Sequence, residues 1–178
     1  MNQTEDAPQK LSKKPPEQLC PCGNRRQYAR CCEQYLTGKK LAPTAETLMR
    51  SRYTAFCLGR TDYLIATHHK EHRAADDPDT LEKSIQNTRW INLLVVGTQK
   101  GQKKDKKGTV EFVAAYRNAT AATSPKIEQL HERSQFVREN GQWFYTEGDM
   151  LPPYRPKREQ PCWCGSGQKF RQCHEKMA

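Results

Sequence analysis

The same arrangement of four candidate metal ligands occurs twice in this chain, once near each end. The motif is C-x-C-x8-C-[CH], and its eight candidate ligands are Cys20, Cys22, Cys31, Cys32, Cys162, Cys164, Cys173 and His174. Every ligand of the second copy follows its counterpart by 142 residues, as Cys162 follows Cys20. A glycine also follows the second cysteine in both copies. Because two coincidental copies of a four-ligand spacing are improbable, we expect each set to act as one site.

Thiolate and imidazole donors in sets of four predict structural zinc. Zinc binds sets of four cysteines, or of three cysteines and one histidine, in a closed tetrahedron, and a set without an open position disfavours a catalytic ion. Glycine at positions 23 and 165 allows the tight reversal that turns both thiolates of C-x-C inward. We therefore expect two zinc ions per chain. Two alternatives stay open, namely structural disulfides and a redox-active C-x-C dithiol that holds no metal.

The composition predicts a cytoplasmic protein with a small hydrophobic core and no membrane span. Only 35% of the residues are hydrophobic, and the mean hydropathy is -1.00. No stretch approaches the roughly 18 apolar residues of a membrane span, and residues 1–18 lack the apolar segment of a secretory signal. A reducing compartment disfavours the disulfide alternative. Metal ligation can offset the small core, since a structural zinc in small peptides contributes about 10–16 kcal/mol.

The net charge of +10 is concentrated at the two ends of the chain. Residues 1–42 carry eight basic and four acidic side chains, and residues 155–178 carry six and two. Basic segments contact nucleic acid, anionic lipid or acidic protein surfaces. The charge alone therefore does not choose among these classes of partner.

Four segments are predicted along the chain. They are a disordered leader (1–18), a first cysteine motif (19–42), a central α+β domain (43–154), and a segment (155–178) that holds an exposed proline-rich linker and the second motif. Helical spacing and capping residues predict helices over 44–58, 62–69 and 80–87. Runs of β-branched and aromatic residues predict strands over 90–99, 109–117, 127–139 and 142–149. Since Asn140-Gly141 is a strong hairpin signal, we expect helices followed by a four-stranded antiparallel meander.

Both cysteine clusters resemble the SEC-C motif. Residues 161–174, PCWCGSGQKFRQCH, are similar to the zinc-binding tail of the preprotein translocase ATPase SecA, which docks the export chaperone SecB. Trp163 stands where that tail commonly has proline. The resemblance implies that the second motif binds zinc and docks a SecB-type chaperone or another acidic protein surface.

A wider stretch resembles bacterial YchJ-type proteins. The similarity runs from Cys20 through the segments 43–46, 48–56 and 62–64, and continues at Trp90 and the strands after it. Members of that family carry SEC-C motifs around a nuclear-transport-factor-2-like (cystatin-like) α+β domain. The resemblance therefore implies a cone of helices on a curved antiparallel sheet, flanked by two small zinc knuckles.

A cone of this kind can hold a small-molecule pocket, and the sequence offers polar and aromatic side chains for it. The candidates are Arg50, Arg52, Tyr53, Tyr63, Trp90, Tyr116, His131 and Trp143. Glu132 is a further polar candidate, and Phe136 and Tyr145 are further aromatic candidates. His131 with Asp149 is a conceivable acid–base pair. We expect His68, His69 and His72 to be exposed at the end of a helix, where they complement its dipole.

Three functions compete at this point. The leading hypothesis is a non-enzymatic zinc protein that binds other proteins through its knuckles. The second is an enzyme or small-ligand binder that uses the central pocket. The third, ranked lower, is nucleic-acid binding through the basic knuckles and the lysine-rich loop 100–107, with an exposed Trp163 stacking on bases.

Overall fold

The computed structural model describes residues 18–73, 78–119 and 126–177. The predicted leader, apart from Gln18, lies outside these residues. Among the described residues, none of the helices has the length and apolar character needed to cross a bilayer.

A four-stranded antiparallel sheet forms the centre of the molecule. Its strands are β1 (Thr88–Lys100), β2 (Lys107–Asn118), β3 (Glu128–Glu139) and β4 (Gln142–Met150), in the spatial order β1-β2-β3-β4. The turn between β3 and β4 places Asn140 and Gly141 at φ 48° and 84°, the left-handed geometry that two-residue hairpins require. Irregularities in β1 and β3 interrupt the register, and such bulges bend a sheet.

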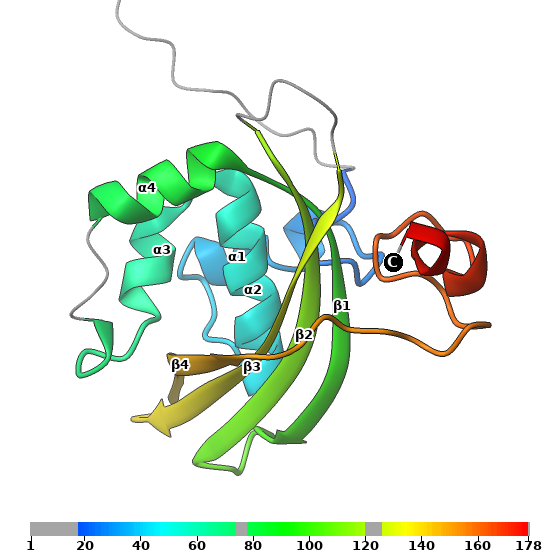
Figure 1. The fold of residues 1–178 in the computed structure, drawn as a ribbon. Helices are drawn as coiled ribbons and strands as arrows, with labels where there is room; N and C mark the ends of the chain where they lie inside the picture. The colour runs from blue at the N-terminus through cyan, green and yellow to red at the C-terminus, as the bar shows by residue number, and fades with distance from the viewer. Residues whose placement is uncertain (1–17, 74–77, 120–125, 178) are drawn as a thin grey trace, which may run out of the picture.

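The helices lie in the concavity of the curved sheet (Figure 1). They are α2 (Ala45–Leu58), α3 (Thr61–Ala66) and α4 (Pro78–Asn87), preceded by the short η1 (Tyr28–Arg30) and α1 (Glu33–Leu36). Helix α2 begins at Thr44, whose side chain accepts a hydrogen bond from the Thr47 amide, and ends at Gly59 with φ 65°. These are favourable N-cap and C-cap arrangements.

The sheet has an apolar cluster on each face. Alternate residues of β2 point to opposite sides, so Val110 and Ala114 pack with the helices while Val113 and Ala115 pack with Trp163 of the second cysteine motif. The predicted α+β cone with four antiparallel strands is thus confirmed, and the sheet lies between the helices on one side and the C-terminal motif on the other.

The segment after α3 differs from its prediction. The helix ends at Ala66, and the chain then pairs with β4, where the His69 amide donates to Tyr145 O at 2.8 Å. His68 and His69 are buried, and the His68 ring lies 3.0 Å from Thr146 O. The expected exposure of these two histidines is therefore wrong, because they attach the end of the helix to the sheet; His72 is exposed.

The predicted exposed linker is partly attached to β3. The Tyr154 amide donates to the Gln129 side chain at 2.9 Å, and Gln129 donates back to Tyr154 O at 3.3 Å. Pro156 is buried. These contacts guide the chain along the back of the sheet into the second motif.

Candidate metal centres

The two cysteine motifs fold into the same backbone loop. In the first, the Cys20 amide donates to Arg26 O at 2.7 Å; in the second, the Cys162 amide donates to Gln168 O at 2.8 Å. Each pair of residues is again offset by 142 positions. The repeat in the sequence is therefore also a repeat in main-chain hydrogen bonding.

The turns inside the loops match as well. Gly23 and Gly165 have φ 76° and 80°, in the left-handed region that glycine adopts without strain. A single 3-10 turn precedes the last pair of ligands in each copy, η1 in the first and η3 (Phe170–Gln172) in the second. Cys31 and Cys173, which follow these turns, have nearly equal backbone angles (φ -123°, ψ -104° and φ -121°, ψ -105°). The spacing thus returns the last pair of ligands to the first.

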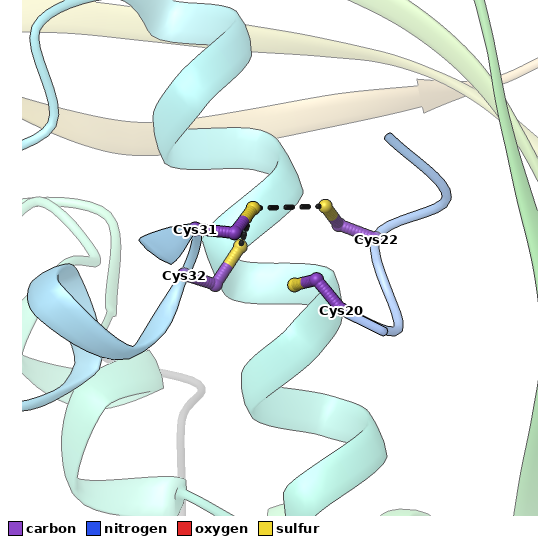
Figure 2. A group of neighbouring side chains, drawn as sticks. All are labelled: Cys20, Cys22, Cys31 and Cys32. Carbon is purple, nitrogen blue, oxygen red and sulfur yellow. Dashed lines mark hydrogen bonds between the residues drawn. The ribbon is translucent and has the colours of Figure 1, made fainter. Parts of the chain in front are cut away.

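The four donor atoms of each motif lie within 4.8 Å of one another, so each set can hold a metal ion. Figure 2 shows the cysteine side chains of the first set gathered beside α2. Its Cys31 sulfur lies 3.6 Å from Cys22 Sγ and 3.7 Å from Cys32 Sγ. A tetrahedron with zinc–sulfur bonds of about 2.3 Å has sulfur–sulfur edges of roughly 3.8 Å, whereas a disulfide bond is about 2.05 Å long. All eight cysteines are free thiols, so the geometry fits a metal and not a disulfide.

In the second set, the histidine offers its Nδ1 atom. Nδ1 of His174 lies 3.3 Å from Cys162 Sγ and 3.2 Å from Cys173 Sγ, and Cys164 Sγ lies 3.6 Å from Cys173 Sγ. The arrangement is the counterpart of the first set, with one histidine in place of the last cysteine. No donor position is left open in either set for a substrate.

The first site belongs to the main core. Its four cysteines are buried, and Cys22 is fully inaccessible to solvent. Arg50 on α2 donates to Cys22 O at 2.9 Å, and Asn24 donates to Cys31 Sγ at 3.0 Å. These donors reduce the cost of placing several thiolates in an apolar environment.

The thiol groups of the first site shift one another's pKa values. Hydrogen bonds from Cys22 and Cys32 hold the pKa of Cys20 far below its usual range, and the hydrogen bond to Cys20 raises the pKa of Cys22 to about 12. Since a metal needs all ligands deprotonated, binding here must release protons.

The second site is held against the back of the sheet by Trp163. This side chain is only 5% exposed, packs in the cluster of Val113 and Phe170, and lies with its ring 4.3 Å from the His174 ring. The expectation that Trp163 is exposed is therefore wrong. The indole packs against the back face of β2, which is apolar and would otherwise be exposed to solvent.

The basic side chains of the second site are partly neutralised within the motif. Arg158 pairs with Glu175 at 3.0 Å, while Lys169 and Arg171 both pair with Glu159 at 2.8 Å. These pairs are largely exposed and contribute little to stability. Among the described residues, the exposed cations Lys157 and Lys176 are not in such ion pairs.

Both sites touch the edge strand β1 at neighbouring residues. A side chain on Gly23 would meet Leu93 O at 3.2 Å, and one on Gly165 would meet the Asn92 side chain at 2.8 Å. Asn92 also donates to Trp163 O at 2.9 Å. Each loop therefore lies beside the middle of β1.

The central domain contains a cavity between the helices and the sheet. Four of the sequence-predicted pocket residues line it, namely Arg52, Tyr53, Trp90 and Tyr116, and the other four, Arg50, Tyr63, His131 and Trp143, do not. Arg50 contacts the first candidate metal site, where it donates to Cys22 O. The Tyr63 hydroxyl is hydrogen-bonded to the Ser51 hydroxyl at 2.8 Å. Trp143 is buried, and its indole nitrogen donates to Pro43 O.

His131 lies on the opposite face of the sheet. Its ring nitrogens lie 2.6 Å from Pro152 O and 3.2 Å from a carboxylate oxygen of Glu111. Glu111 also binds Arg133, which is the main reason that the pKa of this carboxyl is lowered. His131 is therefore paired with Glu111 instead of Asp149, and it attaches the linker to the sheet.

Glu132 on β3, a further polar candidate from the sequence, also lines the cavity. Ser134, Met49, Phe56 and Phe112 line it too and were not among the predicted pocket residues. Neighbouring residues of β3 point to opposite faces of the sheet, so Glu132 faces the cavity and His131 does not. Because polar residues occupy both faces of this strand, the sequence alone did not show which face is internal.

This architecture is that of an NTF2-like domain followed by a SEC-C motif. The model of the YchJ middle NTF2-like domain matches residues 44–148, and the SEC-C motif model matches residues 159–176. The chain belongs to the YchJ family. It is 43% identical over 158 residues to the UPF0225 protein Ent638_2310 of Enterobacter sp. (strain 638), covering 88% of this chain and 97% of that protein.

Two solved structures are similar. The solution structure of RPA3114, a SEC-C motif containing protein from Rhodopseudomonas palustris, has a TM-score of 0.67 at 33% identity and covers 76% of this chain and 100% of its own. The crystal structure of a SEC-C motif containing protein from Psychrobacter arcticus has a TM-score of 0.62 at 28% identity, with 90% and 97% covered. Both similarities support the fold and the assignment of the SEC-C motif.

Proposed function

We propose that this protein binds two structural zinc ions and uses the C-terminal knuckle as a docking surface for an acidic protein. The observation that supports the zinc assignment is the repeated loop. In each copy it brings four donor atoms as close together as the ligands of a tetrahedral metal ion. Thiolate donors suit zinc, copper(I) and iron–sulfur clusters, but a closed set of four cysteines, or of three with one histidine, around one ion is typical of structural zinc.

Metal content per chain tests this assignment. The purified full chain should contain two zinc equivalents by plasma mass spectrometry, and the Cys22→Ala and Cys164→Ala variants should each contain one. Cys57→Ala is the matched control and should retain two, because Cys57 belongs to neither donor set. One equivalent or none in the unmodified chain contradicts the assignment, as does a stoichiometric content of copper or iron.

The docking role rests on the resemblance to the SecA tail and on charge. The exposed cations Lys157 and Lys176 border the second site and can pair with acidic groups of a partner. Complementary charge of this kind raises association rates and gives specificity. A SecB-type chaperone is the partner that the resemblance favours. Nucleic acid is less well supported, because the aromatic side chain that would stack on bases is buried.

The test uses the full chain with reversed charges. Removing residues 157–178 is unsuitable because it uncovers the apolar back face of β2. We expect the double variant Lys157→Glu/Lys176→Glu to bind SecB at least tenfold more weakly by calorimetry. The double variant Lys103→Glu/Lys104→Glu, on the β1–β2 loop, should change the affinity by less than twofold. Equal effects of the two variants, or tighter binding of a single-stranded oligonucleotide than of SecB, would exclude the docking proposal.

A further inference from the structure

The cavity of the central domain is large enough to hold a small molecule. Its volume is about 460 Å³, and its walls come from α2, α3, α4 and all four strands. Small-molecule sites commonly measure about 300–1,000 Å³, whereas voids in a well-packed core rarely exceed the size of a water molecule. The cavity is therefore a pocket of ligand size and not a packing defect.

Solvent reaches the wall of the cavity at α4. Ser84 on this helix lines the cavity and is exposed to solvent, and Thr88 and Tyr116, which also line it, are half-buried. A ligand can therefore reach the interior from this side without unfolding of a described helix or strand. Ala114, which is 1% exposed, lines a deeper part of the wall.

One part of the cavity wall is aromatic. The Trp90 ring lies 5.8 Å from Tyr53, 6.0 Å from Phe56 and 5.7 Å from Tyr116, with interplanar angles of 56–66°. Rings at such separations interact favourably by edge-to-face contact. A flat ring system that enters this region would meet several aromatic surfaces.

The cavity also has a polar corner at Glu132. Its carboxylate accepts a hydrogen bond from Ser134 at 2.6 Å, and it occupies the space that a side chain at Gly148 would fill. Burial raises the pKa of Glu132, and the hydrogen bonds of Ser134 and Tyr145 and the charge of Arg52 only partly offset this effect. A further hydrogen-bond donor at the carboxylate would be favourable here.

The polar corner contains one positive and one negative side chain, Arg52 and Glu132. Arg52 donates to Leu64 O at 2.7 Å and to Thr67 Oγ1 at 2.8 Å, and its guanidinium lies 4.7 Å from the centre of the Tyr145 ring. A cationic ligand would meet the guanidinium, and an anionic ligand would meet the carboxylate. Since desolvating an unpaired charge is costly, the corner favours a ligand without net charge.

We propose that this cavity is a binding site for an uncharged, ring-containing apolar molecule with one N–H or O–H donor. The rings lie among Tyr53, Phe56, Trp90 and Tyr116, and the donor meets the Glu132 carboxylate. This role goes beyond metal binding and protein docking, and it uses a separate part of the molecule.

The first test uses a pair of fluorescent probes. N-phenyl-1-naphthylamine is uncharged, has two aromatic ring systems and carries one N–H, so it matches the proposed class. Its emission should rise on saturable binding to the full-length, metal-loaded protein at one probe per chain. The sulfonated analogue 1-anilinonaphthalene-8-sulfonate, which adds one negative charge, should bind at least tenfold more weakly. Equal or tighter binding of the sulfonate overturns the proposed ligand class.

Substitutions on α4 locate the probe. Ser84→Trp should lower the affinity for the naphthylamine at least tenfold by filling the opening. The matched control is Lys83→Trp, on the same helix but outside the cavity wall, and its affinity should stay within twofold. Equal affinities of the two variants contradict binding in this cavity.

Two further measurements do not depend on these helix variants. Glu132→Leu should weaken probe binding about tenfold, whereas Glu132→Gln, which keeps an acceptor oxygen, should stay within threefold. In methyl NMR spectra of the unmodified protein, the probe should shift Ala114 and leave Ala115 unchanged, because these neighbours face opposite sides of the sheet. Shifts of Ala115 alone would place the probe elsewhere and refute the proposal.

Discussion

The two cysteine motifs share a loop but occupy different surroundings. The first is buried with the helices in the main core, and all four of its ligands are shielded from solvent. The second lies on the back of the sheet, where Cys173 and His174 are only half-buried. Ligand spacing thus determines the local loop in both cases, while the residues around the ligands determine how strongly each site is tied to the rest of the protein.

The largest expected difference concerns loss of a ligand. Cys22→Ala should lower the free energy of unfolding by about 4 kcal/mol or more, because loss of this site disturbs the core under α2. Cys164→Ala should cost about 2 kcal/mol, since it loosens a peripheral loop. Urea unfolding in excess zinc measures both. Equal costs would show that burial does not distinguish the sites.

A packing substitution sharpens the comparison. Trp163→Ala should cost about 3 kcal/mol, as is typical for removal of a buried aromatic side chain, and the variant should still bind two metal ions. Pro21, at the same position of the first motif, is half-buried, and Pro21→Ala should cost less than about 1 kcal/mol. A near-neutral Trp163→Ala would mean that the second motif is not held to the sheet by its indole.

Metal removal should follow the difference in burial. With an excess of chelator, the second site should lose its ion at least tenfold faster than the first, which corresponds to an activation barrier about 1.4 kcal/mol lower. The release is measured from the absorbance of a metallochromic dye. The Cys164→Ala variant identifies the phases, because it should show only the slow one. A single phase of metal release in the unmodified protein would show that burial does not slow release from the first site relative to the second.

The smallest expected difference between the two motifs concerns the glycine that follows each C-x-C pair. Gly23→Ala, Gly165→Ala and Gly167→Ala all place a side chain at positive φ, at a cost of about 1 kcal/mol each. Gly165→Ala should cost about 1 kcal/mol more, because its Cβ would lie 2.8 Å from Asn92. Gly167, which has open space around it, serves as the control in thermal unfolding.

Local signals in the sequence predicted much of the fold. Thr44 and Gly59 bound α2 as expected, and Asn140-Gly141 closes the β3–β4 hairpin. Helix capping and turn formation depend on neighbouring residues, so they can be inferred without tertiary structure. The ligand spacing likewise predicted which side chains meet, because each loop closes on itself.

Long-range packing was not predictable in the same way. Burial of Trp163 depends on Val113, fifty residues away, and no local pattern connects the two. The position of His131 depends on which face of β3 the helices cover, and this strand places Glu132 and Ser134 on its internal face. The cavity wall therefore includes the predicted residues Arg52, Trp90 and Glu132, among others, but not Arg50, Tyr63, His131 or Trp143.

The contact of both loops with β1 has a consequence for solubility. An edge strand offers unpaired backbone groups to other chains, and natural proteins usually cover such edges. Here Gly23 lies beside the Leu93 carbonyl and Gly165 beside the Asn92 side chain, each one residue beyond a candidate metal ligand. We expect loss of metal to loosen both loops and leave this part of β1 open to strand-to-strand aggregation.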